Sequence, residues 1–486
     1  MYILNEDTIC APATVPGTGA ISVIRVSGPD ALTIADKVVK CRKGSISEAA
    51  GYTIKFGNVY DASGAIVDEV LVSIFRAPHS YTGENSVEIS CHASSYIVST
   101  LMNLLYAAGA RAAEPGEFTQ RAFLNGKMDL AQAEAVADVI ASQNAAAHRI
   151  AFKQMKGGFS SELRGMRSEL LELVSLMELE LDFSEEEVEF ADRSRLDGLL
   201  VALIDHITRL IDSFKLGNAI KNGIPVAIAG ATNTGKSTLL NALLGEDRAI
   251  VSDVHGTTRD TVEETMNIDG ILFRFIDTAG LRETDEVVEK IGIERTFKKI
   301  SEASIIIGMV DLTRDHESTC ETIREIIEKV DFDTQKLVFL LNKTDISEVN
   351  TNVASANYIV SSLENKGIKS SVITTAEEVA EKAPIIPVSA KTGTGIDILR
   401  AVLAGSQRDL LTDSDTTLVT NQRHVQALSD SRTSLLRVRD GLATGLPTDL
   451  AAQDIREAIY HLGSIVGEIS TDEVLGNIFR NFCIGK

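Results

Sequence analysis

The sequence has few cysteines, a deficit of positive charge and no long apolar run. Its five cysteines are scattered and form no CxxC pair, which argues against a zinc ribbon and against a disulfide framework. Lys and Arg total 47 against 69 Asp and Glu, so the net charge is −22. This balance excludes a uniformly basic nucleic-acid coat, and a role on RNA or DNA would need a local basic patch or a basic partner.

Signals for export and for membrane insertion are also missing. The first residues, MYILNEDTIC, lack the basic start and the apolar stretch of a secretory signal. No apolar run approaches the roughly 18 residues that a membrane span needs. We therefore expect a cytoplasmic protein of a reducing compartment, without membrane contact. Its 486 residues are enough for roughly two to four domains.

Residue patterns change along the chain and predict separate domains. Residues 1–127 alternate short β-type runs, such as AISVIRV at 20–26, with Gly/Pro turns, which is typical of a small α+β domain. Residues 128–221 have helical spacing. Asp129 and Gln132 match a capping box there, and an apolar stripe includes Leu163, Met166, Leu170 and Leu173.

The second half of the chain predicts an inserted domain. Residues 222–405 alternate strands and helices, with strands expected at 225–229, 271–276, 304–310, 336–341 and 385–388. Residues 406–486 return to helical spacing. Helices on both sides of an α/β unit indicate that a doubly wound α/β domain is inserted into a discontinuous helical domain. The predicted fold class is therefore multidomain, α+β and α/β.

A phosphate-binding motif opens the predicted α/β domain. GATNTGKS at 230–237 matches GxxxxGK[ST], and it lies after an apolar strand and before a helix. In such a loop backbone N–H groups surround phosphates, the lysine reaches the outer phosphates and the last hydroxyl binds Mg²⁺. The nucleotide contacts predicted here are Gly230, Asn233, Thr234, Gly235, Lys236, Ser237 and Thr238.

Three shorter motifs, DTAG at 277–280, NKTD at 342–345 and SAK at 389–391, each follow a predicted strand. Asp277 can hold the Mg²⁺ shell and Gly280 can donate its N–H to a γ-phosphate. Asp345 can accept two hydrogen bonds from the N1–H and N2–H edge of guanine, a donor pair that adenine lacks. Four motifs along one edge of a parallel sheet predict a GTPase. The predicted contacts are Asp277, Thr278, Ala279, Gly280, Asn342, Lys343, Asp345, Ser389, Ala390 and Lys391.

Between the first two motifs, GTTRD at 256–260 predicts a switch loop with Thr258 as the second Mg²⁺ ligand. Many small GTPases have a water-orienting Gln directly after the DxxG glycine, but this chain has Leu281. Another group must then orient water, and a cation must replace an arginine finger. The candidates nearby are Arg282, Glu283, Asp285, Glu286 and Glu289. The nucleotide contacts predicted in the switch are Ser252, Asp253, Val254, His255, Gly256, Thr257 and Thr258.

Four stretches together resemble one family, the bacterial and organellar tRNA-modification GTPases called MnmE or TrmE. They are GTTRD at 256–260, DTAGLRET at 277–284, EPGEFTQRAFLNGKMDLAQAEAVADVI at 114–140 and FCIGK at 482–486. The resemblance runs essentially end to end. It implies an N-terminal folate-binding and dimerisation domain over 1–127, a discontinuous helical bundle over 128–221 and 406–486, and an inserted Ras-like GTPase domain over 222–405.

The resemblance also implies a reaction and its partners. A homodimer, with an FAD-dependent partner in a heterotetramer or larger complex, would modify carbon 5 of the wobble uridine of certain tRNAs by carboxymethylaminomethylation. The implied cofactors are GTP, Mg²⁺, K⁺ and 5-formyltetrahydrofolate or a related folate, the one-carbon donor. No membrane takes part.

Site residues are implied residue by residue. Folate contacts fall on Arg25, Glu88, Lys127 and Lys486. Potassium ligands fall on Asn233, Thr257 and the carbonyls of Ser252 and Val254, and Mg²⁺ ligands fall on Ser237 and Thr258. Glu289 is the acidic residue linked to hydrolysis, and Asn233, Thr257, Thr258 and Gly280 complete the implied catalytic set.

Several alternatives stay open. Cys483 fits a reactive thiol beside Lys486 or a packed apolar residue. A regulatory GTPase of ribosome assembly is the rival function, although such proteins usually append a basic RNA-binding domain and this chain appends acidic-to-neutral parts. The stretch between Asp345 and Ser389 is longer than the family usually shows. For tRNA contact, the sequence offers a stretch with little acid, which is either a phosphate-binding patch or a solvated helix face: Arg149, Lys153, Lys156, Arg164 and Arg167.

Overall fold

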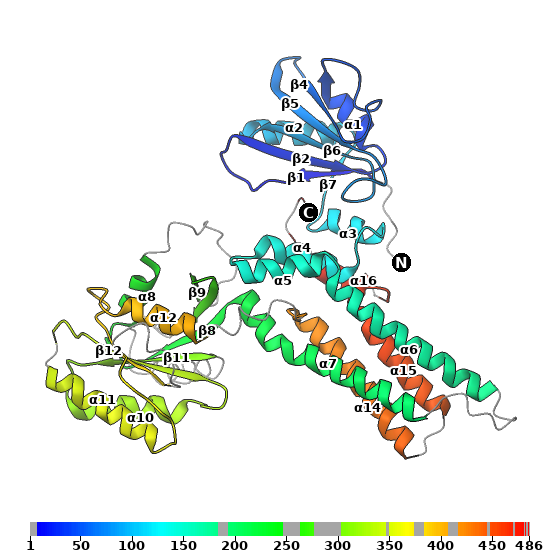
Figure 1. Ribbon diagram of the computed structural model, residues 1–486. Helices are drawn as coiled ribbons and strands as arrows, with labels where there is room; N and C mark the ends of the chain where they lie inside the picture. The colour runs from blue at the N-terminus through cyan, green and yellow to red at the C-terminus, as the bar shows by residue number, and fades with distance from the viewer. Residues whose placement is uncertain are drawn as a thin grey trace, which may run out of the picture. The chain divides into compact units, whose positions relative to one another are not determined.

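A computed structural model of the chain describes residues 7–182, 193–245, 263–276, 303–346, 349–373, 383–406, 417–444, 448–469, 472–480, 482 and 485. The chain divides into two compact units (Figure 1). The first comprises Met1–Ala141, Ala151–Arg209 and Arg423–Lys486, and the second comprises Ser142–Ile150 and Leu210–Gln422. None of the helices described is long and apolar enough to cross a membrane.

The first unit contains a seven-stranded sheet in the order β3-β4-β5-β6-β2-β1-β7. Neighbouring strands are antiparallel except for the parallel pair of β1 and β7. Helices α1 (Ala31–Val38) and α2 (Ser95–Ala108) share one apolar core with the sheet. The strands are β1 (Ile9–Pro12), β2 (Ile21–Ser27), β3 (Val39–Cys41), β4 (Thr53–Tyr60), β5 (Ile66–Phe75), β6 (Ser86–His92) and β7 (Arg111–Ala112).

Alternating burial along β5 explains why this sheet has one covered face. Val70, Val72 and Ile74 are buried in the core with α1 and α2, whereas the alternate residues Glu69 and Leu71 are exposed. Side chains of a strand point to opposite faces in turn, so a period of two buries one face only. The α+β prediction for this part of the chain is confirmed.

The rest of the first unit is helical. Its helices are α3 (Glu117–Leu124), α4 (Leu130–Ala141), α6 (Gly158–Asp182), α14 (Gln422–Ala443), α15 (Thr448–Val466) and α16 (Asp472–Phe479), while α5 (Ala145–Met155) and α7 (Arg193–Asn222) run across the boundary of the units. The predicted capping box at α4 is confirmed: the Asp129 N–H donates to Gln132 Oε1 at 3.0 Å, and the Gln132 N–H donates to Asp129 Oδ1 at 2.9 Å. The predicted stripe of α6 is buried at Leu163, Met166, Leu170 and Leu173, and α6 packs against α15 (Figure 1).

A buried charged cluster joins helices that are far apart in the sequence. Glu134 of α4 accepts hydrogen bonds from His424 Nε2 at 2.6 Å and from Arg423 Nε and Nη2 at 3.1 and 3.0 Å. Arg423 also donates to the carbonyls of Ser464 and Ile465 in α15, and the His424 ring lies 5.4 Å from that of Phe159 in α6. The cluster connects four helices, which confirms the predicted discontinuous helical bundle.

The second unit contains a six-stranded sheet in the order β13-β12-β11-β8-β10-β9, parallel except for β9 against β10. The strands are β8 (Ile224–Ala229), β9 (Glu263–Ile268), β10 (Ile271–Ile276), β11 (Ile305–Asp311), β12 (Lys336–Asn342) and β13 (Ile385–Pro387). Five of them lie where strands were predicted. β9 was not predicted from the sequence. Asp269 and Gly270, with φ of 51° and 84°, form an Asp-Gly turn, which is a typical signal of a β-hairpin.

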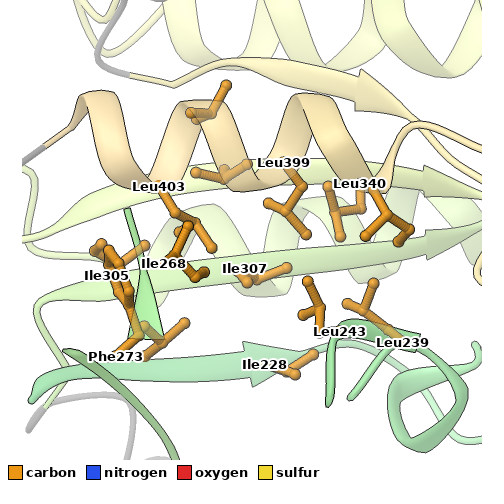
Figure 2. Close-up of a cluster of buried hydrophobic side chains, with 14 of the residues drawn as sticks. Ile228, Leu239, Leu243, Ile268, Phe273, Ile305, Ile307, Leu340, Leu399 and Leu403 are labelled. Carbon is orange, nitrogen blue, oxygen red and sulfur yellow. The ribbon is translucent and has the colours of Figure 1, made fainter. Parts of the chain in front are cut away.

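Helices cover both faces of this sheet. On one face, α8 (Lys236–Gly245) and α12 (Ile396–Gly405) share an apolar core with the strands, and Figure 2 shows Leu239, Leu243, Leu399 and Leu403 packed there against Ile307 and Leu340. On the other face, α10 (His316–Lys329) and α11 (Val349–Glu364) pack over Phe339. Burial on both faces explains why β11 is apolar except for Gly308 and its last residue, Asp311, since strands of parallel sheets are covered on both sides.

Candidate functional site

The GxxxxGK[ST] motif forms the turn from β8 into α8, as predicted. Asn233 has φ of 63°, in the left-handed region that asparagine tolerates better than most residues. Gly235 has φ of 98°, and a Cβ there would come within 2.5 Å of Asn342 Nδ2. A side chain at either glycine of the motif is excluded, since a Cβ on Gly230 would lie 2.5 Å from the Met309 carbonyl oxygen. The two glycines therefore let the loop pack closely against the ends of β11 and β12.

The motif lysine folds over this loop. Lys236 Nζ donates to the carbonyl oxygens of Gly230 and Ala231 at 2.7 and 2.8 Å. Thr234 is buried and its hydroxyl donates to the Ala231 carbonyl at 2.9 Å, whereas Asn233 and Ser237 are exposed. The ammonium of Lys236 therefore lies against the loop that would surround the phosphates.

Asn342, at the end of β12, joins three of the predicted motifs. Its side chain is buried, its Nδ2 donates to the Thr234 carbonyl at 2.7 Å, and its Oδ1 accepts from the Ala390 N–H at 3.0 Å. Ser389 Oγ donates to Asp345 Oδ1 at 2.9 Å. The phosphate-binding loop and the two guanine-recognition motifs are thus held together at one edge of the parallel sheet, where nucleotides bind in such folds.

A further charged group at this edge was not predicted. Asp311 ends β11 and accepts from Lys343 Nζ at 2.6 Å and from the N–H and hydroxyl of Thr313 at 3.0 and 2.7 Å. Burial alone would raise the pKa of Asp311, but the bonds from Lys343 and Thr313 outweigh it and keep the pKa below its ordinary value. Asp311 is therefore ionised, and its carboxylate binds Lys343, the lysine of the NKTD motif.

Arg314, three residues after Asp311, reaches the phosphate-binding loop. Its Nη2 donates to the Thr232 carbonyl oxygen, and its Nε lies 4.0 Å from Asp311 Oδ2. The carbonyl belongs to the peptide that enters the left-handed Asn233, so Arg314 helps to hold an unfavourable backbone conformation. In the sequence, the only indication that Arg314 belongs to the site is its position after the end of a strand, and this indication is weak.

We expect Arg314→Ala to speed GDP dissociation by roughly tenfold, since a hydrogen bond from a charged group contributes about 1.5 kcal/mol or more. Stopped-flow release of a fluorescent GDP measures this rate. The matched control is Arg324→Ala, which removes an exposed guanidinium on α10 that contacts Tyr358. Equal dissociation rates in wild type and Arg314→Ala would show that Arg314 does not support the loop.

The N-terminal sheet brings two predicted folate contacts together. Arg25 on β2 pairs in register with Glu88 on β6, and its Nε and Nη2 donate to Glu88 Oε1 at 3.0 and 2.8 Å. The guanidinium carbon lies 5.2 Å from the centre of the Tyr81 ring and 5.6 Å from that of Phe118. Arg25 Nη1 also donates to the Gly485 carbonyl at 3.4 Å, so the C-terminal segment reaches this pair.

Lys127 lies against the same loop that carries Tyr81. Its Nζ donates to the Pro78 carbonyl at 2.9 Å, and its side chain passes Gly83. The Tyr81 hydroxyl is hydrogen-bonded to Thr119 Oγ1 at 2.9 Å, and burial raises the pKa of Tyr81. The structure thus joins Arg25 and Glu88 directly, and it connects Lys127 to them through the 78–83 loop.

Comparison with known proteins identifies the family. A model of the MnmE helical domain matches residues 130–483, and a model of the N-terminus of the GTP-binding protein TrmE matches residues 8–127. A tRNA modification GTPase MnmE of Bacteroides thetaiotaomicron is 50% identical over 486 residues, which cover 99% of this chain and 100% of the relative. Its counterpart in Parabacteroides distasonis is 50% identical over 484 residues, with the same coverage.

The chain belongs to the MnmE family of tRNA modification GTPases. It is a GTP hydrolase that acts in tRNA modification. A solved GTP-binding protein of Sulfolobus solfataricus in complex with GDP is also similar, at 19% identity over 50% of this chain and 67% of that one, but the TM-score of 0.27 is too low to bear on the fold.

Part of the predicted site lies outside the described residues. These positions are the switch residues Ser252, Asp253, Val254, His255, Gly256, Thr257 and Thr258, the DTAG residues Asp277, Thr278, Ala279 and Gly280, and Glu289, Cys483 and Lys486. Their roles stay predictions.

Proposed function

We propose that this chain is a potassium-activated GTPase that works with an FAD-dependent partner. Together they modify carbon 5 of the wobble uridine of certain tRNAs by carboxymethylaminomethylation, with a tetrahydrofolate as one-carbon donor. Family membership supports the tRNA reaction. The observation that carries the nucleotide site is Asn342, which binds Thr234 and Ala390 and so joins the phosphate loop to the guanine-recognition loops.

We propose that each sequence motif binds a different part of the GTP molecule. Backbone N–H groups of 230–238 and Lys236 bind the phosphates, and Asp345 accepts from the guanine edge beside Ser389 and Lys391. Ser237, exposed at the start of α8, and Thr258 are the Mg²⁺ ligands we propose. Hydroxyl oxygens suit this hard cation, which commonly keeps several waters and binds through substrate phosphates.

For the activating cation, we propose K⁺ at Asn233, Thr257 and the carbonyls of Ser252 and Val254. Asn233 fits this role because it is exposed on the phosphate loop and offers a neutral oxygen. A neutral oxygen cage suits a large monovalent ion.

For the attacking water, we propose Glu289, acting through a bridging water, because Leu281 takes the usual place of a glutamine. Glu289→Ala is expected to lower kcat and to leave nucleotide affinity intact, since the carboxylate would touch no ground-state phosphate. Single-turnover hydrolysis and equilibrium binding of a fluorescent GTP analogue separate the two quantities. Parallel losses in both would indicate a misfolded switch instead.

For the folate, we propose Arg25, Glu88, Lys127 and Lys486. The described part of this site fits the ligand's chemistry: cations for a glutamate tail, a carboxylate for the amino and ring N–H groups of a pterin, and two aromatic rings beside Arg25. When bound, the folate would supply a one-carbon unit. The homodimer, the partner complex and a thiol role of Cys483 belong to the same proposal.

Glu88→Ala should weaken binding of 5-formyltetrahydrofolate by roughly tenfold, because a hydrogen bond to a charged acceptor contributes about 1.5 kcal/mol or more and the Glu88 side chain is 29% exposed. Isothermal titration calorimetry measures the affinity. Glu69→Ala is the matched control, because Glu69 pairs with Arg42 on the same sheet. If Glu88→Ala binds the folate with wild-type affinity, Glu88 is not a folate ligand.

Mass spectrometry of tRNA nucleosides tests the function as a whole. Cells that lack this chain should lose the carbon-5 modification of the wobble uridine, and the wild-type gene should restore it while Lys236→Ala should not. Normal tRNA nucleosides together with an accumulation of ribosome precursors would instead support a ribosome-assembly GTPase.

A further inference from the structure

The free edge of the N-terminal sheet carries a concentration of positive charge. β3 is the end strand of this sheet as described and pairs with β4 alone. Four cations lie here, and we call Lys40, Arg42, Lys43 and Lys55 the β3 patch. Residues 37–55 contain Glu48 as their single acidic residue, in a chain whose net charge is −22. The β3 patch is thus positively charged, opposite in sign to the net charge of the chain.

Aromatic rings hold two of these cations in place. Lys40 Nζ lies 5.1 Å from the centre of the Tyr60 ring, and the Arg42 guanidinium carbon lies 4.4 Å from that of Phe56. Because Tyr60 and Phe56 are four residues apart on β4, their rings lie on the same face of the strand. Each cation is therefore positioned over a ring and still faces solvent, with 66% of the Arg42 side chain exposed.

The backbone of the edge contacts the other cations, although Lys55 pairs with the buried Val72 and so lies on the opposite face of the sheet from Phe56. The Arg42 N–H donates to the Phe56 carbonyl at 3.1 Å, which extends the pairing of β3 with β4, and Lys55 Nζ donates to the Lys43 carbonyl at 3.4 Å. Glu69 forms an ion pair with Arg42 at 3.1 Å, and both side chains are more than half exposed. Such an exposed pair contributes little to stability. A phosphate group of a bound ligand can therefore replace Glu69 as the partner of Arg42.

The rings of the patch share a face of the sheet with Arg25 and Glu88. Phe56 pairs with Leu71, Ser73 pairs with Glu88, and Glu88 pairs with Arg25. Paired residues lie on the same face, as do residues two apart. Three strand spacings separate β4 from β2, which is about 14 Å. A chain molecule bound along the β3 patch would therefore lie within a few nucleotides of the proposed folate site.

We propose that the β3 patch binds the phosphate backbone of the RNA on which this family acts. Charge complementarity favours a polyanion, and aromatic rings beside the cations suit the exposed bases of a single-stranded loop. The proposal deepens the proposed function, because it assigns the tRNA to a surface of this chain. In the patch suggested by the sequence at 149–167, Arg164 pairs with Asp129 at 2.6 Å and Arg167 with Glu468 at 2.5 Å, with partners less exposed than Glu69. Its other three cations lie on α5 or directly after it and serve as the control in the test.

The test compares two triple variants of the full-length protein. Lys40→Glu/Arg42→Glu/Lys43→Glu should bind fluorescently labelled bulk tRNA at least roughly tenfold more weakly. The slope of log affinity against log salt should fall by about two, because each phosphate contact to a single strand contributes about 0.7. The control Arg149→Glu/Lys153→Glu/Lys156→Glu makes the same change of charge on α5. It should keep near wild-type affinity, and both variants should keep the wild-type rate of GTP hydrolysis.

Several outcomes would overturn the proposal. Unchanged affinity and slope in the β3 variant, loss in the α5 variant alone, or absence of tRNA binding by the wild type would each do so. A change of oligomeric state in analytical ultracentrifugation would assign the patch to an interface between protein chains. If the charge reversal prevents folding, the milder Lys40→Gln/Arg42→Gln/Lys43→Gln should also weaken tRNA binding, with a slope change of about two. Failure of the proposed function is seen separately, as normal wobble nucleosides in cells without the chain.

Discussion

GTP hydrolysis by the full-length protein should be on the order of a hundredfold faster in potassium chloride than in sodium chloride at equal ionic strength. Phosphoryl transfer spreads negative charge over the bridging and γ-oxygens, and a preorganised cation that stabilises this charge is worth about that factor. Of the potassium ligands we propose, Asn233 lies in the described part of the chain, exposed on the phosphate loop with φ of 63°. A cage that fits K⁺ is too wide to coordinate the smaller Na⁺ fully.

The choice of variant matters because Asn233 has a left-handed backbone. Asn233→Ala removes the side-chain oxygen but also strains the loop, whereas Asn233→Gly removes the oxygen and tolerates the conformation. Both should abolish the advantage of K⁺, and Asn233→Gly should leave GTP binding nearly intact. Asn267→Ala, in the exposed hairpin of β9, is the matched control. Steady-state hydrolysis in both salts, with equilibrium binding, gives these quantities.

The same cation should control association of the GTPase domains. If the switch loop supplies potassium ligands, as we propose, its closure should expose a surface for pairing. Association is therefore expected only with K⁺ and a transition-state mimic such as aluminium fluoride, as size-exclusion chromatography would show. If hydrolysis is equal in the two salts and Arg282→Ala removes it, the charge is stabilised by an arginine finger and the potassium proposal is wrong.

Glu134→Gln should destabilise the helical part of the first unit by about 3 kcal/mol. Removal of one partner from a buried ion pair costs about 3–5 kcal/mol. His424 is buried but a quarter of the Arg423 side chain is exposed, so we expect a value at the lower end. Glu457→Gln on α15 is the matched control, since Glu457 pairs with Arg437 in solvent and such pairs contribute about 0–1 kcal/mol. Hydrogen–deuterium exchange of peptides from α4 and α14 reports the local stability of each variant.

This cluster also predicts how stability depends on pH. Burial alone would raise the pKa of Glu134, but the charges and hydrogen bonds of His424 and Arg423 outweigh it and lower the pKa from 4.5 to about 2. A carboxylate with a depressed folded pKa stabilises fully above its unfolded pKa, and this stabilisation is lost as the pH falls from 4.5 towards 2. The contribution is about 3 kcal/mol by linkage. Glu134→Gln should lose that part of the acid dependence, and an unchanged profile would contradict the assignment.

Local patterns in the sequence were sufficient for the elements and motifs of the nucleotide site. The apolar strands, the glycines of 230–237 and the capping box at Asp129 and Gln132 are short-range features, in which neighbouring residues restrict the backbone directly. β9 was missed because its composition is mixed and its Asp-Gly turn was the only clear signal.

Contacts between distant residues were decided by the tertiary structure alone. Glu134 lies about 290 positions from Arg423 and His424, and Arg314 is 82 positions from Thr232. A charged residue in the sequence carries no mark of the partner that folding will bring to it, since helix packing and strand order set the distance. The chain's own residues therefore determined that it has a phosphate loop and a guanine-recognition motif. Only the packed sheet and helices determined which carboxylate holds Lys343, which arginine supports the phosphate loop and which cations line the free edge of β3.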